Sequence, residues 1–440
     1  MNSIKWLFLI SIAVVISHGD YYLKPDKRAP SKIDNLPNNS VADMRDIPQD
    51  PSYYAPQIIP FSKERQKQLD TNYNDRYFAP WKWQRLEISP ENLGWETRFV
   101  RKKPIYTIFG KEIPKKTYEK WITNAQMDQY DTIKAKAITI RRTDLKAFPI
   151  QESFYRDPRQ TGEGFPFDYN QNSAYPINMP LYISHFSKDK KWAFVHGAYA
   201  FGWLPMEDIA FVDEKFQRTF QNGSYAIAIR DNLRLFESKK SISLVKLGTL
   251  FPYTKEGYLF GTKQSNGYAK VRYAKSTDGE IMAAKPLPFT PKNVGKIAKE
   301  FYGEPYGWGE CYETRDCSAT TRDFFAPFGI FLDRNSREQA KNGTYIPIGH
   351  LSPEAKKQAI LKHALPFRSM LYVPGHIVLY LGSYNNEPVI MHTYWGVRQY
   401  DFSKLITART IITTTEPGKE LPQTRPESQL LNTLQGIISF

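Results

Sequence analysis

Cys311 and Cys317 are the only cysteines of this 440-residue chain, and both lie in the stretch YGWGECYETRDCSATTRDFF. A disulfide between them would close too small a loop to add much stability, and the spacing is not that of a C-x-x-C or zinc-finger site. The remaining interpretation is that one of the two cysteines is a nucleophile. Asp316 and Ser318 flank Cys317 as helix-capping residues, and a helix that begins there would lower the pKa of the thiol and offer backbone N–H groups to an oxyanion.

A thiol nucleophile needs a base, and histidine is the usual one. His376 opens the strand-like segment HIVLYLG and His392 ends VIMHTY, with a turn expected at Asn385 and Asn386. A hairpin of this kind would place the two imidazoles opposite each other. We predict that His376 is the base and that His392 orients it. The other histidines fall in a predicted signal peptide, in a predicted barrel or in polar segments: His18, His185, His196, His350 and His363.

The elements that hold these residues belong to a predicted α+β domain at residues 286–415. TPKNVGKIAKEFYG and DCSATTRDFFAPFG have the apolar spacing of helices, and the two strands of the histidine hairpin follow them. Helices followed by an antiparallel sheet are typical of an α+β fold. We expect residues 416–440 to form a C-terminal tail, apolar enough to pack on the body or on a partner.

Two small β barrels are predicted before this domain, at residues 133–215 and 216–285. Both regions contain short alternating runs of five to eight residues separated by turn residues. The stretch SKDKKWAFVHGAYAFGWLPMEDIAFV resembles the bacterial SH3 signature, with Trp192, Gly197 and the run GWLP, and residues 216–285 resemble a second, more divergent copy.

The N-terminal part divides into three predicted segments. Residues 1–19 combine Lys5, a short apolar run and small residues as in a secretory signal peptide, and an uncleaved membrane anchor is the alternative. Residues 20–52 are rich in Pro and Asn, as in an extended arm, and residues 53–132 show helical spacing. The protein is therefore expected to be exported, to the periplasm or cell envelope.

The net charge and the motifs of the chain limit the classes of partner that the protein could bind. The formal net charge is +15, but no zinc-finger spacing, RNA-binding aromatic signature or long basic block is present, so we expect no nucleic-acid partner. For an exported protein, an anionic envelope surface fits the charge, and a basic surface that merely keeps the protein solvated fits it equally well.

The motifs EPYGWGECYETRDCSATTRDFF, GHIVLYLG and MHTYWG resemble those of the NlpC-type papain-like cysteine peptidases of bacterial cell walls. With a helical region and two SH3 modules before it, the arrangement resembles the γ-D-glutamyl-L-diamino-acid endopeptidases. The resemblance implies a papain-like α+β core and a murein stem peptide as substrate. It also implies that the SH3 modules wall off part of the cleft and restrict cleavage to short stem peptides.

Carried over motif by motif, the resemblance makes Cys317 the nucleophile, His376 the base and His392 the third catalytic residue. It makes Tyr306 a tyrosine that lines the site. Asp316 and Ser318 match residues that recognise the ammonium of a free N-terminal L-Ala, a role that suits a carboxylate.

The chain departs from the family pattern at two positions. Glu310 stands where the family often has Gly after Trp308 and Gly309, and Ala319 replaces the usual Gly after Asp-Cys-Ser. The first change could alter the charge near the site. Arg334 and Arg337, in LDRNSREQAKNG, are polar-segment residues that could bind acidic groups of the stem peptide.

The sequence thus predicts an exported cysteine endopeptidase that hydrolyses the γ-D-Glu–diaminopimelate bond of stem peptides with a free N-terminal L-Ala. No metal or cofactor is expected. The alternatives are another murein amidase or D,D-endopeptidase, and a non-catalytic wall-binding protein. Because Cys311 is close in sequence to Cys317, an oxidative bridge that inactivates the enzyme is a further hypothesis.

Overall fold

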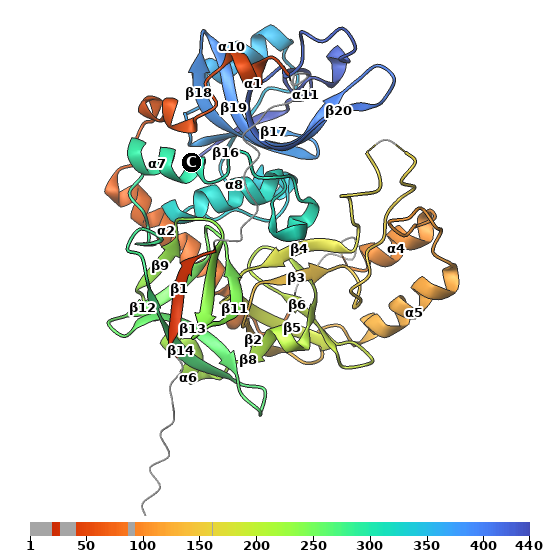
Figure 1. Ribbon diagram of the computed structural model, residues 1–440, viewed down its shortest axis with the longest axis vertical. Coiled ribbons are helices and arrows are strands. Elements are labelled where there is room, and N and C mark those ends of the chain that lie inside the picture. The colour runs from red at the N-terminus through yellow and green to blue at the C-terminus, as the bar shows by residue number, and fades with distance from the viewer. Residues whose placement is uncertain (1–19, 27–40, 87–92, 161) are drawn as a thin grey trace, which may run out of the picture.

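The computed structural model describes residues 20–26, 41–86, 93–160 and 162–440. The predicted signal peptide at residues 1–19 lies outside this part of the chain. Figure 1 shows one sheet at the top of the molecule and two barrels side by side below it. A helical N-terminal region, two β barrels and a C-terminal α+β domain are present, which confirms the predicted fold class.

The C-terminal domain is built on an antiparallel sheet in the order β16-β21-β17-β18-β19-β20. Its strands are β16 (Thr344–Pro347), β17 (Ser369–Val373), β18 (His376–Tyr384), β19 (Glu387–Arg398), β20 (Lys404–Thr414) and β21 (Gly436–Ser439). Its helices are α7 (Pro291–Lys299), η5 (Trp308–Glu313), α8 (Cys317–Phe325), η6 (Ala326–Phe328), α9 (Ser336–Gln339), α10 (Pro353–His363), η7 (Pro426–Ser428) and α11 (Leu430–Thr433).

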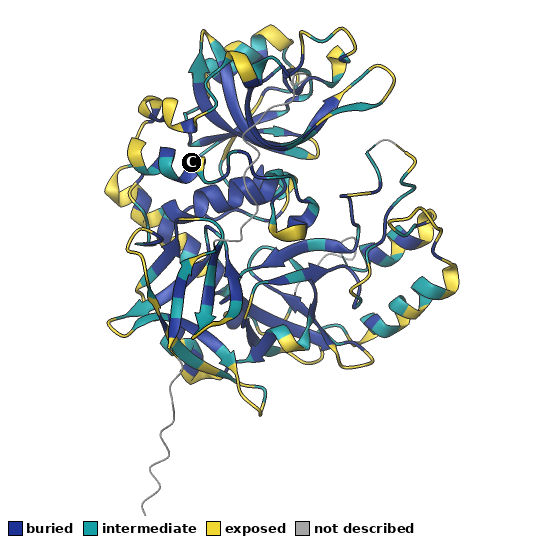
Figure 2. Ribbon diagram, viewed as in Figure 1, coloured by how far each residue is buried: buried dark blue, intermediate teal, exposed yellow. Residues whose placement is uncertain are grey.

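Local signals in the sequence explain how these elements begin and turn. The Thr290 side chain accepts the Asn293 N–H and caps α7, a position that threonine favours. Asn385 and Asn386 join β18 to β19 with positive φ angles of 48° and 62°, the conformation that a tight hairpin turn requires. Helix α8 is buried from Ser318 to Phe325, and Figure 2 shows it in dark blue between the sheet and the barrels.

The first barrel contains seven strands in the order β4-β3-β7-β6-β5-β2-β8. They are β2 (Ala135–Thr139), β3 (Thr143–Lys146), β4 (Gln171–Tyr175), β5 (Pro180–Phe186), β6 (Trp192–His196), β7 (Phe201–Pro205) and β8 (Ile209–Phe211), with η4 (Met206–Asp208) before β8 and α6 (Glu214–Phe220) after it. Trp192 and Trp203 are buried, so both tryptophans of the SH3-like motif are core residues.

The second barrel includes a strand from the N-terminal end of the described chain. Its strands are β9 (Tyr225–Ala228), β10 (Leu233–Glu237), β11 (Lys240–Val245), β12 (Leu250–Thr254), β13 (Gly257–Lys263), β14 (Ala269–Ser276) and β15 (Met282–Ala284). Strand β1 (Tyr21–Pro25) lies between β10 and β14 and pairs with both. Part of the predicted extended arm is therefore a barrel strand, because alternate residues such as Leu23 fill the barrel core.

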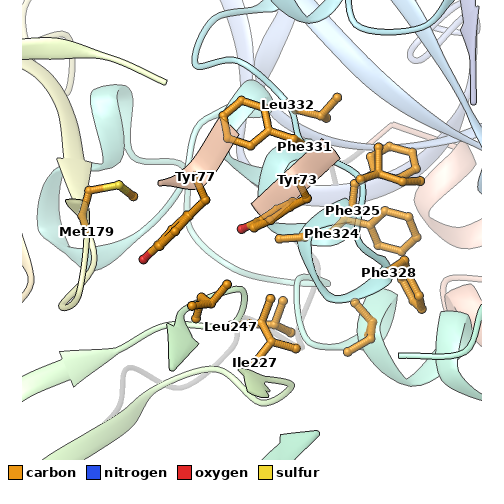
Figure 3. Packing of buried hydrophobic residues seen from close by; sticks show 14 of the residues in the cluster. Tyr73, Tyr77, Met179, Ile227, Leu247, Phe324, Phe325, Phe328, Phe331 and Leu332 are labelled. Carbon is orange, nitrogen blue, oxygen red and sulfur yellow. The ribbon is translucent and has the colours of Figure 1, made fainter. Parts of the chain in front are cut away.

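The N-terminal helices pack against the later domains. They are α1 (Asp43–Asp46), η1 (Pro51–Tyr53), η2 (Ala55–Gln57), α2 (Lys63–Tyr77), α3 (Ala79–Lys82), α4 (Trp95–Lys102), α5 (Lys115–Ala125) and η3 (Met127–Gln129). Figure 3 shows Tyr73 and Tyr77 of α2 beside Phe324 and Phe331 of the C-terminal domain, with Leu247 of the second barrel close by. These residues belong to one buried cluster that joins the domains.

The C-terminal segment is part of the sheet rather than a separate tail. Strand β21 lies between β16 and β17 and pairs with both. Ile437 and Ile438 are fully buried, so the apolar residues noted in the sequence fill the core of the C-terminal domain. Within the described ranges, no helix has both the length and the apolar character needed to cross a membrane.

Candidate active site

Cys317 is the first residue of α8, as predicted. The Asp316 side chain caps the helix by accepting the Ala319 N–H at 2.9 Å. The Cys317 side chain is partly exposed. The backbone N–H groups of Ile377 and Ser318 lie close enough to its sulfur to favour the thiolate. Because Ile377 directly follows His376, these contacts bring the thiol beside the start of β18.

His376 and His392 meet through their rings. His376 Nε2 lies 3.1 Å from His392 Nδ1, a hydrogen-bond distance between the two imidazoles. His392 is buried, whereas His376 is partly exposed where β18 begins. The structure thus brings together Cys317, His376 and His392, as the sequence predicts.

The register of the hairpin differs from the predicted one by two residues. Leu379 pairs with Met391 and Tyr380 with Ile390, so His376 is diagonal to His392 rather than opposite it. In this register Tyr394 lies opposite His376. His392 is two residues before Tyr394 on the same strand, and residues two apart share a face, so the two histidine side chains still point to the same face of the sheet. The diagonal offset remains within reach of two imidazole rings, as the distance between their nitrogen atoms shows.

The pKa of Cys317 is shifted in the direction opposite to the sequence expectation. Burial, followed by the nearby Asp316 carboxylate, raises the pKa of the thiol to about 12, although the backbone N–H groups of Ile377 and Ser318 and the Arg334 guanidinium each act to lower it. Burial also lowers the pKa of His376 to about 4 and that of His392 well below its usual value. The raised pKa of the thiol and the lowered pKa values of the two imidazoles favour neutral forms of all three groups in the free protein at neutral pH.

Tyr306 lies in an aromatic group beside the thiol. Its ring centroid is 5.5 Å from that of Trp395 and 6.2 Å from that of Phe167, which belongs to the first barrel. Burial and the nearby Cys317 raise the pKa of Tyr306 well above its usual range, so its hydroxyl stays protonated and able to donate a hydrogen bond.

Asp316 and Ser318 lie in the same site, but a buried guanidinium already binds both. Arg334 donates to Asp316 Oδ2 at 2.7 Å, to Asp316 Oδ1 at 3.2 Å and to Ser318 Oγ at 2.9 Å. Asp316 also accepts bonds from Ser318 Oγ and from the backbone N–H groups of Gly309 and Ala319. The carboxylate predicted to bind a substrate ammonium is therefore paired within the protein. Arg337, the other arginine of this segment, is exposed.

Glu310 connects the site to the first barrel, a role that the sequence analysis missed. Its carboxylate pairs with Arg322 at 2.8 Å and with Arg334 at 3.1 Å, and it accepts a bond from Ser173 Oγ at 2.9 Å. These cations hold the pKa of Glu310 below its usual value despite burial. The only signal in the sequence was that Glu310 stands where the family often has glycine. That signal did not indicate which residues the Glu310 carboxylate would bind.

The cleft that contains Cys317 has a volume of about 710 Å³. Tyr306, Asp316 and Ser318 line it from the C-terminal domain. Its opposite side is formed by other domains: Asn172, Tyr199 and Phe201 from the first barrel, and Trp95 and Phe99 from α4. The first barrel and the N-terminal helices thus form walls of the cleft.

Cys311 is separate from this machinery. Both cysteines are free, and Cys311 is buried. Burial and the nearby Asp168 and Asp144 raise the pKa of its thiol to about 12. A protonated, buried thiol is a poor nucleophile and a poor partner for disulfide exchange.

Comparisons with known proteins agree with this arrangement. Residues 303–411 match the NlpC/P60 family, residues 153–205 match an SH3 domain of the SH3b1 type, and residues 7–130 match the N-terminal NLPC_P60 stabilising domain. No curated protein matches the chain significantly.

Solved structures similar to the chain include an NlpC/P60 endopeptidase from Photobacterium damselae subsp. piscicida, with 22% identity and a TM-score of 0.79 over 89% of this chain and 97% of that one. A protein of the same family from Bacillus cereus matches with 14% identity and a TM-score of 0.41 over 70% and 99%. The likeness to the Photobacterium structure shows that the two chains share a fold. The chain therefore contains an NlpC/P60 domain, joined to an SH3b1-type SH3 domain and to an N-terminal NLPC_P60 stabilising domain.

Proposed function

We propose that the protein is a cysteine endopeptidase that hydrolyses the γ-D-Glu–diaminopimelate bond of peptidoglycan stem peptides outside the cytoplasm. The observation that carries the proposal is the placement of Cys317 at a helix start beside the bonded pair His376 and His392, within a walled cleft. The match of residues 303–411 to the NlpC/P60 family supports peptidoglycan as the substrate.

The reaction starts from the neutral pair that burial favours. As the Cys317 sulfur attacks the γ-carbonyl carbon of D-Glu, His376 takes the thiol proton. The backbone N–H of Cys317, at the helix start, donates to the oxyanion. His376 then gives the proton to the nitrogen of diaminopimelate as the C–N bond breaks. His376 then takes a proton from water as the water oxygen attacks the thioester carbon; the C–S bond breaks, the Cys317 thiolate takes that proton back from His376, and the γ-carboxyl group of D-Glu is released and ionises in solution.

The walls of the cleft favour a short peptide as substrate. Asn172 and Phe201 of the first barrel and Trp95 of α4 face the same space as Cys317. A long, cross-linked strand of wall would have to pass between these domains. We therefore infer that stem peptides released from the wall, or their free ends, are cleaved faster than intact sacculi.

The cleft gives less support to a requirement for a free N-terminal L-Ala. Two carboxylates line it among the described residues, and each has a cationic partner: Asp316 pairs with Arg334 at 2.7 Å, and Glu338 pairs with Lys341 at 2.7 Å. An ammonium would have to compete with a buried, multiply bonded guanidinium. We expect acetylation of the L-Ala amine to lower kcat/KM by less than about tenfold, roughly 1.4 kcal/mol. A fall of 100-fold or more would restore the ammonium role of Asp316.

Incubation with L-Ala-γ-D-Glu-diaminopimelate under reducing conditions, followed by mass spectrometry, tests the proposal. We expect free diaminopimelate from the wild type and from Cys311→Ala, and none from Cys317→Ala. Cys311→Ala is the matched control because it removes the other thiol of the chain. Loss of activity in both variants, or an intact tripeptide with the wild type, would contradict the proposal.

Two other functions give different results with the same proteins. A murein amidase or D,D-endopeptidase would leave the tripeptide intact but release Cys317-dependent products from isolated muropeptides. A non-catalytic wall-binding protein would sediment with purified peptidoglycan and change none of these substrates. The hydrogen-bonded histidine pair beside Cys317 favours an enzyme over the binding protein.

A further inference from the structure

The hydrogen-bonded pair of histidines extends to a third residue, Thr413 of β20. His392 Nε2 lies 3.1 Å from Thr413 Oγ1, on the side of the ring away from His376. In the register of β19 and β20, Thr413 pairs with Ile390 and His392 with Ile411, so Thr413 and His392 are diagonal neighbours on one face. Thr413 is fully buried and His392 nearly so.

The Thr413 hydroxyl has a single hydrogen, and that hydrogen has another acceptor. Thr413 Oγ1 donates to the Thr414 carbonyl oxygen at 2.7 Å. Toward His392 the hydroxyl therefore presents a lone pair. His392 Nε2 must then carry a hydrogen, because a hydrogen bond needs one donor.

The same accounting fixes the hydrogens on both rings. A neutral imidazole has one N–H and one lone pair, so a hydrogen on His392 Nε2 leaves a lone pair on His392 Nδ1. That lone pair accepts from His376 Nε2, 3.1 Å away. His376 Nε2 therefore carries its hydrogen, and His376 Nδ1 keeps the lone pair that a base needs. Within the described residues, the structure gives His376 Nδ1 no hydrogen bond of its own.

We propose that Thr413 is a positioning residue whose hydroxyl, acting as an acceptor toward His392, sets the tautomers of both histidines and leaves His376 Nδ1 free to take the Cys317 proton. A hydroxyl that donated to His392 instead would reverse both rings and place a hydrogen on His376 Nδ1, where it would block the base. The proposal rests on the proposed function for its link to catalysis, but its structural part concerns the free protein alone.

Two variants of the full chain separate the hydroxyl from the shape of the side chain. Thr413→Val keeps the branched shape and removes the acceptor, and Thr413→Ser keeps the hydroxyl. Thr410→Val is the matched control, because Thr410 is a fully buried threonine of the same strand whose hydroxyl bonds to Thr393 and not to an imidazole.

The readout that does not depend on a substrate is nitrogen NMR of the protein with isotope-labelled histidine. We expect the wild type and Thr413→Ser to carry the hydrogen on Nε2 of both rings, and Thr413→Val to shift His392 toward the Nδ1–H form. A wild-type protein with the hydrogen on Nδ1 of His376, or a Thr413→Val protein with wild-type tautomers, would overturn the proposal. The wild-type measurement stands even where Thr413→Val does not fold.

The kinetic readout uses the tripeptide and, separately, alkylation of Cys317 by iodoacetamide. We expect Thr413→Val to lower kcat and the alkylation rate at neutral pH by about tenfold with little change in KM, while Thr413→Ser and Thr410→Val stay within about threefold of the wild type. An equal loss in Thr413→Val and Thr410→Val would reduce Thr413 to a packing residue. An uncleaved tripeptide with tautomers as expected would refute the proposed function and leave the tautomer assignment intact.

Discussion

The chain places two pairs of histidines on neighbouring strands, one in the C-terminal sheet, where His392 is buried and His376 partly exposed, and one in the first barrel. His185 of β5 is as buried as His392, and His196 of β6 is also buried; burial lowers the pKa of both, to about 3 for His196. Burial, strand placement and a lowered pKa therefore do not distinguish a candidate catalytic pair from a structural one.

The hydrogen-bond partners do distinguish the pairs. His185 contacts the Ala125 carbonyl oxygen at 2.9 Å and Ser184 Oγ at 3.0 Å, and His196 contacts the Tyr130 hydroxyl at 3.2 Å. These bonds hold the barrel pair to its surroundings. In the C-terminal sheet the two rings bond to each other, and one of them lies beside a thiol. The comparison predicts that the pairs differ in activity but resemble each other in stability.

The largest expected difference is the loss of the base. We expect His376→Asn to lower kcat/KM on the tripeptide by about 10⁴-fold, because the thiol loses its proton acceptor. His196→Asn, the matched change in the barrel, should lower it less than about threefold. Steady-state kinetics on the two variants checks this, and similar losses in both would erase the distinction between the pairs.

The next effect concerns the orienting residue. We expect His392→Ala to lower kcat about 100-fold, because His376 Nε2–H loses its acceptor. His392→Asn should retain more activity than His392→Ala, since its amide oxygen can accept the same hydrogen. The ratio of kcat between these two variants is the measurement, and an alanine variant as active as the asparagine variant would show that the acceptor does not matter.

The two pairs should contribute alike to the pH dependence of stability. Folding lowers the pKa of His376 to about 4 and of His196 to about 3, so the unfolded chain binds more protons below its own histidine pKa of about 6.5. The stabilisation is complete above pH 6.5 and is lost as the pH falls toward the folded values. Between about pH 6.5 and 5, a well-buried histidine should cost roughly 2 kcal/mol of unfolding free energy.

Denaturant unfolding at several pH values measures this effect. His196→Phe and His376→Phe should each flatten the acid side of the stability curve. A flattening in only one of the two variants would mean that the rings do not share the burial that makes both neutral.

The next prediction concerns how the alkylation rate of the Cys317 thiol depends on pH. Burial raises the pKa of Cys317, so we expect its alkylation rate to increase with pH to beyond pH 8.5, the usual thiol value, with no plateau at acid pH. Rates measured on Cys311→Ser, which has one thiol, check this. A plateau between about pH 5 and 7 would instead indicate a stable thiolate–imidazolium pair.

The smallest effect is expected for Cys311. Because Cys311 is buried and its thiol pKa is raised to about 12, we expect Cys311→Ser to lose activity in mild oxidant at nearly the wild-type rate. Inactivation curves of the two proteins give the comparison. A clearly slower loss in the variant would support the oxidative bridge that the spacing of the two cysteines suggested.

Features with local causes were predictable from the sequence. The Thr290 cap, the Asp316 cap and the turn at Asn385 and Asn386 each depend on a few neighbouring residues, and the structure contains all three. The meeting of Cys317, His376 and His392 was predictable because a helix start and one hairpin carry it.

Features that depend on distant segments were not predictable. Strand β1 pairs with β10 more than two hundred residues away, and β21 enters the sheet from the end of the chain. The buried partners of Asp316 and Glu310 likewise come from other segments, since Arg334 and Ser173 reach them only in the folded protein. Raised thiol and lowered imidazole pKa values follow from burial, which one helix start does not reveal.

The central claim is that Cys317 forms a covalent bond to the substrate. Acid quenching of the wild type within its first turnover of the tripeptide, followed by digestion and mass spectrometry, tests it. We predict that the peptide containing Cys317 gains the mass of the L-Ala-γ-D-Glu acyl group and that the Cys311 position stays unmodified. Release of diaminopimelate with no adduct on Cys317, together with cleavage by Cys317→Ala, would contradict the account.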